Sequence, residues 1–126
     1  YDRNIMSRRI AKKEGGLSRV YFEVVSKLSV KIRTTEQYWN IITKIKHPVM
    51  RGKERVVQKA LQEPNIIRRS RVDKNVYLFY RKYQKHHLVV VVRHLNKREG
   101  FIITTYITDI IKEGIQVWPK QSKTIK

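Results

Sequence analysis

Four β-rich runs follow one another so closely in the second half of the chain that only hairpins can connect them. The runs are Ile66 to Val72, Val76 to Tyr83, Leu88 to His94 and Phe101 to Thr108. The connections between them hold only a few residues, whereas a parallel crossover needs about a dozen or more. The sequence therefore predicts that these four runs form an antiparallel meander.

A helix is expected upstream of the meander. Thr34 and Gln37 have the spacing of a capping box, which favours a helix start. Apolar residues then recur at helical intervals as far as Ile45. The helix should end at His47, because the residue before a proline avoids the α region.

Residues 52 or 53 to 63 form a second predicted helix, which Pro64 stops. Before the first helix, the β-rich segments 19–25 and 28–33 predict a strand or a loose hairpin that leads into the domain. Together these elements predict an α+β fold, in which N-terminal strand(s) and two helices pack on a four-stranded antiparallel sheet.

Neighbouring positions in a strand point to opposite faces of a sheet. Thr104 and Tyr106, together with Ile102, are therefore expected to point away from the helices. The residues expected to pack between the helices and the sheet are Trp39, Ile42, Val57, Leu61, Val90, Val92, Ile103 and Ile107. Around this single domain, residues 17–118, we expect a basic arm at 1–16 and a basic tail at 119–126.

The charge of the chain is its most unusual quantity. Lys and Arg number 29 and Asp and Glu number 10, which gives a formal net charge of +19 and a pI of about 10.5. Self-repulsion of this size destabilises a compact chain, so a polyanionic partner is expected. Nucleic acid ranks first, an acidic protein inhibitor second and an anionic membrane surface third. The apolar runs are far shorter than the ~20 residues of a membrane span.

Thiol and metal chemistry find little support in the sequence. The chain has no cysteine, which excludes a disulfide framework and a thiolate nucleophile and allows a reducing cytoplasm. Asp109 and Glu113 are the only acidic residues closer together than nine positions, whereas a magnesium-dependent nuclease needs convergent carboxylates. We therefore expect no metal and no cofactor, and a cytoplasmic location.

Histidine, arginine, tyrosine and threonine remain as the residue types that could do chemistry. His47 lies at a predicted helix end, where a capping or packing role is the alternative. His86 and His87 fall in a predicted hairpin turn, where exposure to solvent is expected. The arginines of segment 68–71 form either a solvated face or a phosphate site. Without clustered carboxylates, these residue types indicate metal-independent RNA cleavage, in which the ribose 2′-OH attacks the adjacent phosphorus.

Several short motifs suggest a known family. They are Lys46-His47-Pro48, the segment Pro64 to Ser70, Tyr80-Arg81, the run Val89 to Val92 and the segment Gly100 to Tyr106. In these motifs the chain, over about residues 36–118, resembles the phage- and toxin-associated nuclease domains of the barnase–EndoU–colicin–RelE superfamily. The resemblance implies a metal-independent ribonuclease with a RelE/barnase-like fold and an active site on the exposed face of its sheet.

The resemblance also implies functional positions: His47, an arginine of segment 68–70, Tyr80 or Arg81, and Thr104 with Tyr106. We predict a catalytic set of His47, Arg69, Tyr80, Arg81 and Thr104, and an RNA-binding set of Arg68, Arg71, Tyr106, Lys46 and Arg93. In this hypothesis His47 is the general base or acid and Arg69 stabilises the phosphorane. In the alternative, Tyr80 or Arg81 carries the proton or charge and His47 only caps its helix.

The sequence thus predicts a metal-independent endoribonuclease, as a toxin or a mobile-element-associated nuclease, whose products end in a 2′,3′-cyclic phosphate. The alternative is a non-catalytic basic module that binds RNA or DNA with the same sheet. The expected partners are RNA and an acidic antitoxin or immunity protein, and no membrane is expected to take part.

Overall fold

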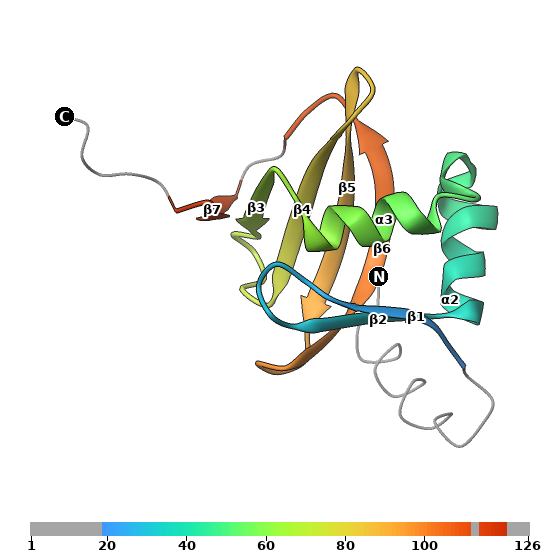
Figure 1. The fold of residues 1–126 in the computed structure, drawn as a ribbon, viewed down its shortest axis with the longest axis horizontal. Helices are drawn as coiled ribbons and strands as arrows, with labels where there is room; N and C mark the ends of the chain where they lie inside the picture. The colour runs from blue at the N-terminus through green and yellow to red at the C-terminus, as the bar shows by residue number, and fades with distance from the viewer. Residues whose placement is uncertain (1–18, 112–113, 121–126) are drawn as a thin grey trace.

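A single sheet of seven strands dominates the computed structural model, which describes residues 19–111 and 114–120 (Figure 1). The strands are β1 (Val20–Val25), β2 (Lys31–Thr35), β3 (Ile66–Arg69), β4 (Val76–Tyr83), β5 (His86–His94), β6 (Glu99–Thr108) and β7 (Ile115–Trp118). Their order across the sheet is β1-β2-β6-β5-β4-β3-β7. The predicted basic arm and residues 121–126 of the predicted tail lie outside the described residues.

The predicted fold, a four-stranded antiparallel sheet with two helices packed on it, is wrong. The four predicted runs do pair as consecutive hairpins, from β3 to β6. However, β7 adds a strand outside β3, and the β1–β2 hairpin adds two strands outside β6. Because β2 runs parallel to β6, the seven-stranded sheet is mixed.

The N-terminal hairpin was predicted and is present as β1 and β2. Its place in the sheet and the strand β7 escape a local analysis for physical reasons. The pairing of β2 with β6 joins segments that are far apart in the sequence, and no local pattern specifies it. β7 has only four residues, which is too short for its periodicity to be recognised. Local patterns therefore predict β1 and β2 as strands, but they do not predict that β2 pairs with β6 or that β7 extends the other edge.

Two short helices and two single turns complete the described fold. They are α2 (Glu36–Ile41), the π-helical turn η1 (Ile42–Lys46), the 3-10 turn η2 (Pro48–Met50) and α3 (Glu54–Gln62). Thr35 rather than Thr34 caps α2, and its side-chain oxygen accepts a hydrogen bond from the Tyr38 N–H at 3.0 Å. Helical structure before Pro48 ends at η1, as the sequence predicts.

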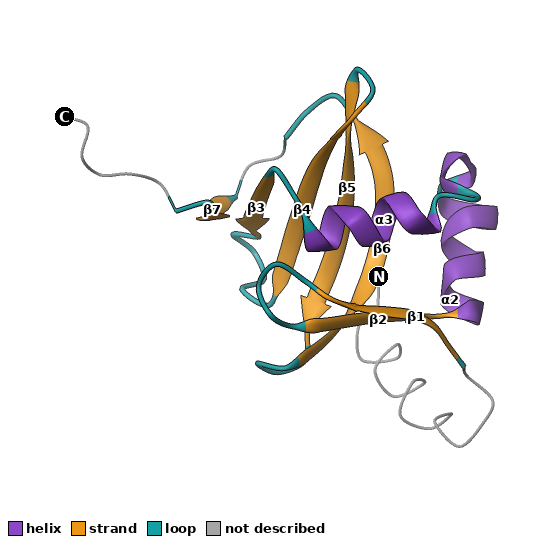
Figure 2. Ribbon diagram, in the orientation of Figure 1, coloured by secondary structure: helices purple, strands orange, loops and turns teal. Residues whose placement is uncertain are grey.

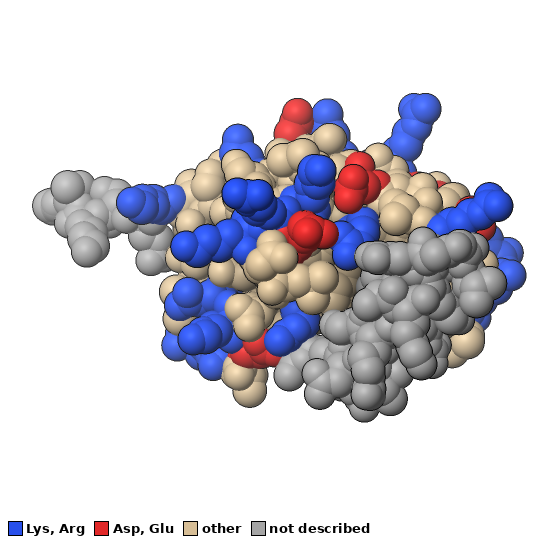
Figure 3. Space-filling view, turned by 90° about the horizontal axis from the view of Figure 1, so that it is seen from below, with Lys and Arg blue, Asp and Glu red and all other residues tan. Residues whose placement is uncertain are grey.

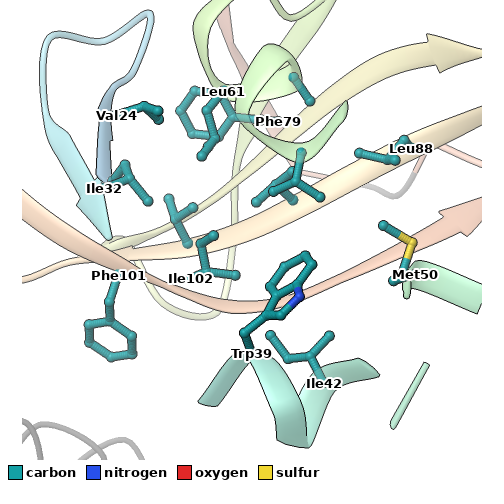
Figure 4. Packing of buried hydrophobic residues seen from close by; sticks show 14 of the residues in the cluster. Val24, Ile32, Trp39, Ile42, Met50, Leu61, Phe79, Leu88, Phe101 and Ile102 are labelled. Carbon is teal, nitrogen blue, oxygen red and sulfur yellow. The ribbon is translucent and has the colours of Figure 1, made fainter. Parts of the chain in front are cut away.

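The helix α3 crosses one face of the sheet, in contact with β4 and β5 (Figures 1 and 2). Figure 4 shows Leu61 of this helix close to Phe79 of β4. Six of the predicted core residues are buried in the main cluster, namely Trp39, Ile42, Val57, Leu61, Val90 and Val92. Ile103 and Ile107 are only partly buried and pack against that cluster.

An extra residue in β6 decides which of its side chains face α3. The pairing with β5 skips Ile103, which is a β-bulge between Ile102 and Thr104. As a result Ile102 packs in the main core, contrary to the expectation from simple alternation. Tyr106 points to the other face, as predicted, because alternation resumes after the bulge.

The face of the sheet away from α3, which we call the open face, carries a second and smaller apolar cluster. Leu78, Tyr80 and Val89 are buried in this cluster. Strand pairing and alternation assign six further polar side chains to the same face: Arg68, Lys82, His87, Arg93, Thr104 and Thr108. The open face thus combines an aromatic and aliphatic floor with cationic and hydrogen-bonding groups.

Leu61→Ala should lower the free energy of unfolding by about 2–5 kcal/mol, because the deleted side chain is 0% exposed and leaves a cavity beneath α3. Urea unfolding measures this loss. Leu95→Ala is the matched control, since Leu95 is 41% exposed, and it should change stability by only about 0.5 kcal/mol. Wild-type stability of the Leu61 variant would contradict the packing of α3 on the sheet.

Candidate functional site

His47 is fixed at the end of η1 by its own backbone. Its N–H donates to the carbonyl of Ile42 at 2.7 Å, and its carbonyl accepts from the N–H of Met50 at 2.9 Å. Ile42 and Met50 are both 0% exposed, so the two anchors of His47 belong to the core. The imidazole is only partly buried, and it is therefore a surface group on a rigid support.

The segment that carries His47 reaches the sheet where the edge of β6 is not paired with β2. The parallel pairing covers only Glu99 to Phe101 of β6. Beyond it, the hydroxyl of Tyr38 donates a hydrogen bond to the carbonyl of Ile103 at 2.7 Å. This bond satisfies the backbone oxygen of the bulge residue and fixes α2 against the edge of β6.

The ring of His47 lies against Tyr106, with centroids 5.4 Å apart and ring planes inclined by 35°. Burial lowers the pKa of His47 below that of an ordinary histidine, and the positive charge of Lys46 lowers the pKa further. The imidazole is therefore neutral at neutral pH, which is the form that can accept a proton.

The pKa of Tyr106 is shifted in the opposite direction to that of His47. Burial raises the pKa of its phenol, and the neighbouring Tyr80 raises the pKa further. The phenol therefore stays protonated at neutral pH and can donate a hydrogen bond. His47 and Tyr106 together offer a proton acceptor and a hydrogen-bond donor on one small patch.

Tyr80 and Thr104, two further predicted catalytic residues, lie on the open face but beneath this patch. Tyr80 is 1% exposed and shares one row across the sheet with Val89 and Tyr106. The hydroxyl of Thr104 is buried, and no described residue hydrogen-bonds to it. We interpret both residues as part of the floor under Tyr106.

The two predicted catalytic arginines do not join His47. Strand pairing and alternation place Arg69 and Arg81 on the face that α3 crosses. The guanidinium of Arg81 donates to the carbonyl of Glu63, directly after α3. The fold therefore gives no support to Arg69 as the group that stabilises a phosphorane beside His47.

The predicted RNA-binding residues lie on the open face or at its margins. They are Arg68, Arg93, Tyr106, Lys46 and Arg71. Arg93 pairs with Asp73 at 2.5 Å, which fixes its guanidinium near the end of β5. The amino group of Lys46 lies 3.5 Å from the hydroxyl of Tyr38, next to His47.

Exposed cations gather at the end of the sheet opposite to His47. The β3–β4 and β5–β6 loops carry four of them, Arg71, Lys74, Lys97 and Arg98, which we call the basic rim. Figure 3 views this end of the molecule from below, and Lys and Arg outnumber the acidic residues on its left side. Within the described residues, no carboxylate forms an ion pair with these four cations.

Hydrogen bonds shape both loops of the basic rim. The carboxylate of Asp73 accepts from the N–H of Asn75 at 3.0 Å, and the side chain of Asn96 accepts from the N–H of Arg98 at 2.7 Å. The N–H of His94 donates to the carbonyl of Asn75 at 2.8 Å, which joins the end of β5 to the first loop. The cations of the rim are therefore presented on ordered loops, which reduces the entropy lost on binding.

One contact at the other end of the sheet was missed in the sequence. An imidazole nitrogen of His86 contacts a carboxylate oxygen of Asp109, although the two residues are 23 positions apart. The predicted hairpin of β5 and β6 could have indicated this contact, because extending its strand pairing by two residue pairs places residue 86 opposite residue 109. Because the predicted strand began at Leu88, two residues after the true start of β5, neither this contact nor the position of His87 in the sheet was predicted.

A cavity of about 220 Å³ is lined by residues of β1, α2, η1 and the start of α3. Tyr21, Trp39 and two carboxylates, those of Glu36 and Glu54, line it. The hydroxyl of Tyr21 donates to Glu54 at 2.8 Å, and this bond raises the pKa of Tyr21. Two cations, Lys44 and Arg51, also line this cavity and balance the two carboxylates, so it has no excess positive charge that would attract a phosphate.

Comparisons with family models, with curated proteins and with solved structures find no match to this chain. The resemblance to the nuclease superfamily therefore rests on the short motifs alone. In the described ranges, 19–111 and 114–120, no helix has the length and apolar character of a membrane span. In the same ranges, no three His, Asp or Glu side chains come together in a way that could hold a metal ion.

Lys46→Gln should raise the pKa of His47, because it removes one of the two causes that lower this pKa. Burial remains, so the pKa should stay below that of an ordinary histidine. An NMR titration of the His47 ring protons measures the change. Lys44→Gln, in the same exposed turn, is the control and should leave the titration unchanged. An unchanged His47 titration in the Lys46 variant would contradict the electrostatic coupling.

Proposed function

We propose that this protein is a metal-independent endoribonuclease that holds RNA on the open face of its sheet and cleaves it beside His47. The observation that carries the proposal is the contact between the fixed imidazole of His47 and the phenol of Tyr106, whose burial favours the uncharged form of each group. The net charge of +19 supports a polyanionic substrate. In this proposal the enzyme acts in the cytoplasm, as a toxin or a mobile-element-associated nuclease.

The chemistry needs a base, a stabilised phosphorane and a protonated leaving group. His47 takes the proton of the ribose 2′-OH, whose oxygen then attacks the adjacent phosphorus. Lys46, whose charge reaches His47, stabilises the developing negative charge in place of Arg69. Tyr106 donates a hydrogen bond to a phosphate oxygen. The bond between phosphorus and the 5′-oxygen breaks as this oxygen receives a proton and leaves as a hydroxyl, and a 2′,3′-cyclic phosphate remains.

The basic rim contributes affinity in this proposal. Tyr106 lies five positions after Phe101, which is near the rim, and five steps correspond to about 17 Å along the strand. An RNA strand of several nucleotides spans that distance. Its flanking phosphates can therefore contact the rim while the scissile phosphate lies beside His47.

His47→Ala should lower the rate of RNA cleavage in EDTA by about 10²–10⁴-fold, because the general base is lost. RNA affinity and the melting temperature should stay nearly unchanged, since only the partly buried ring of His47 is removed. Gel analysis of a labelled RNA measures the rate, and His86→Ala, at an exposed histidine on the other face of the sheet, is the control.

Two results would contradict this mechanism. A His47→Ala protein that cleaves RNA in EDTA at the wild-type rate would exclude the histidine as base. Cleavage of DNA at the same rate as RNA would exclude attack by the 2′-OH, because DNA lacks this hydroxyl. The expected products carry a 2′,3′-cyclic phosphate, which mass spectrometry distinguishes from a linear phosphate.

Replacing all four cations of the basic rim by Gln should weaken RNA binding and flatten its salt dependence. Each lost phosphate contact reduces the slope of log affinity against log salt by about 0.7 for a single strand, so four contacts reduce it by about 3. The matched control replaces four exposed cations near α2 and α3: Lys44, Arg51, Arg55 and Lys59. An equal effect of both variants would show that charge acts without a defined surface.

The alternative function is a non-catalytic module that binds RNA or DNA with the same open face and basic rim. Salt-sensitive binding without any cleavage in EDTA would favour this module over the enzyme. An acidic antitoxin or immunity protein is the proposed protein partner in either case, because the cationic surface that attracts RNA also attracts carboxylates.

A further inference from the structure

We propose that His87 is the general acid of this cleavage, the group that protonates the 5′-oxygen as it leaves. The inference rests on the proposed ribonuclease function. After His47 has taken the 2′-proton, a ribose alkoxide remains a poor leaving group unless it receives a proton of its own. A second proton-transfer group is therefore needed on the far side of the phosphorus.

Strand pairing places His87 on the open face beside Tyr106. His87 lies two residues before Val89, which is buried in the cluster of that face. It is directly opposite Thr108, so Tyr106 is its diagonal neighbour, at about 7–8 Å. Since His47 contacts Tyr106 from the free edge of β6, Tyr106 lies between the two imidazoles.

This arrangement fits the geometry of an in-line displacement. Each imidazole needs a hydrogen bond of about 3 Å, and the attacking oxygen starts about 3–3.5 Å from phosphorus, so the two nitrogens stand about 10 Å apart. The 5.4 Å between His47 and Tyr106 and the diagonal spacing to His87 give a separation of this order. A phosphate above the ring of Tyr106 can then reach both histidines.

The other described groups near this position suit the role less well. Tyr106 is a weak acid at neutral pH, because its pKa is raised. Lys82 lies directly opposite His87. Its role in this proposal is to supply a positive charge that balances the negative charge of the bound phosphate. Alternation places His86 and His94 on the face that α3 crosses.

The proposed step balances its protons and bonds. The 2′-oxygen gives its proton to His47 and forms a bond to phosphorus, while the bond between phosphorus and the 5′-oxygen breaks. His87 gives a proton to that 5′-oxygen. The enzyme ends with a protonated His47 and a neutral His87, and exchange with water restores both.

Two substrates with different leaving groups test the assignment in EDTA. One is a uridine-containing dinucleotide, whose 5′-oxygen must be protonated. The other is uridine 3′-(4-nitrophenyl phosphate), whose nitrophenolate leaves without a proton. His87→Ala should lower cleavage of the dinucleotide by about 10²-fold or more and change cleavage of the nitrophenyl ester by less than about threefold. His47→Ala should lower both, because the base is needed for either substrate.

His87→Gln repeats the test with a side chain that keeps polar contacts, and a thermal melt checks that both variants fold. Wild-type cleavage of the dinucleotide by both variants would overturn the proposal, as would an equal loss on both substrates. A wild-type protein that cleaves neither substrate would overturn the ribonuclease function itself, and the assignment of His87 with it.

Discussion

The candidate site depends on the point at which β2 stops pairing with β6. Three residues of β6, Glu99 to Phe101, are paired with β2, and the edge beyond them is free. Tyr38 occupies this edge through its hydrogen bond to the carbonyl of the bulge residue Ile103. If β2 continued along β6, α2 could not approach the sheet, and His47 would not reach Tyr106. A short parallel pairing and a bulge thus create the place where the imidazole meets the open face.

The sequence was sufficient to predict the meander, the helix end at Pro48 and the buried face of α3, because residues that are close together in the chain determine these features. It also indicated that Thr104 and Tyr106 share a face. The contribution of β2 to the sheet could not be predicted, because its pairing with β6 joins distant segments. For the site, local alternation did not indicate that Arg69 faces away from His47, since the strand carries arginines on both faces. The pairing of β3 with β4 determines the face of the sheet on which Arg69 lies.

The two faces of the sheet have different roles. One face packs against α3 and supplies most of the buried apolar area. The other has only a small apolar cluster, and that cluster supports Tyr106. Burial of Tyr106 keeps its phenol protonated, and partial burial of His47 beside Lys46 keeps the imidazole neutral. The same desolvation that packs the site therefore favours the uncharged forms of both side chains, which the proposed chemistry requires.

The most direct test of the central claim, that RNA lies on the open face beside His47, is an NMR titration with a short 2′-O-methyl RNA, which cannot be cleaved. The largest shift changes should fall on His47, Tyr106 and the loops of the basic rim. Changes centred instead on Tyr21 and Trp39, at the cavity on the other side, would contradict it.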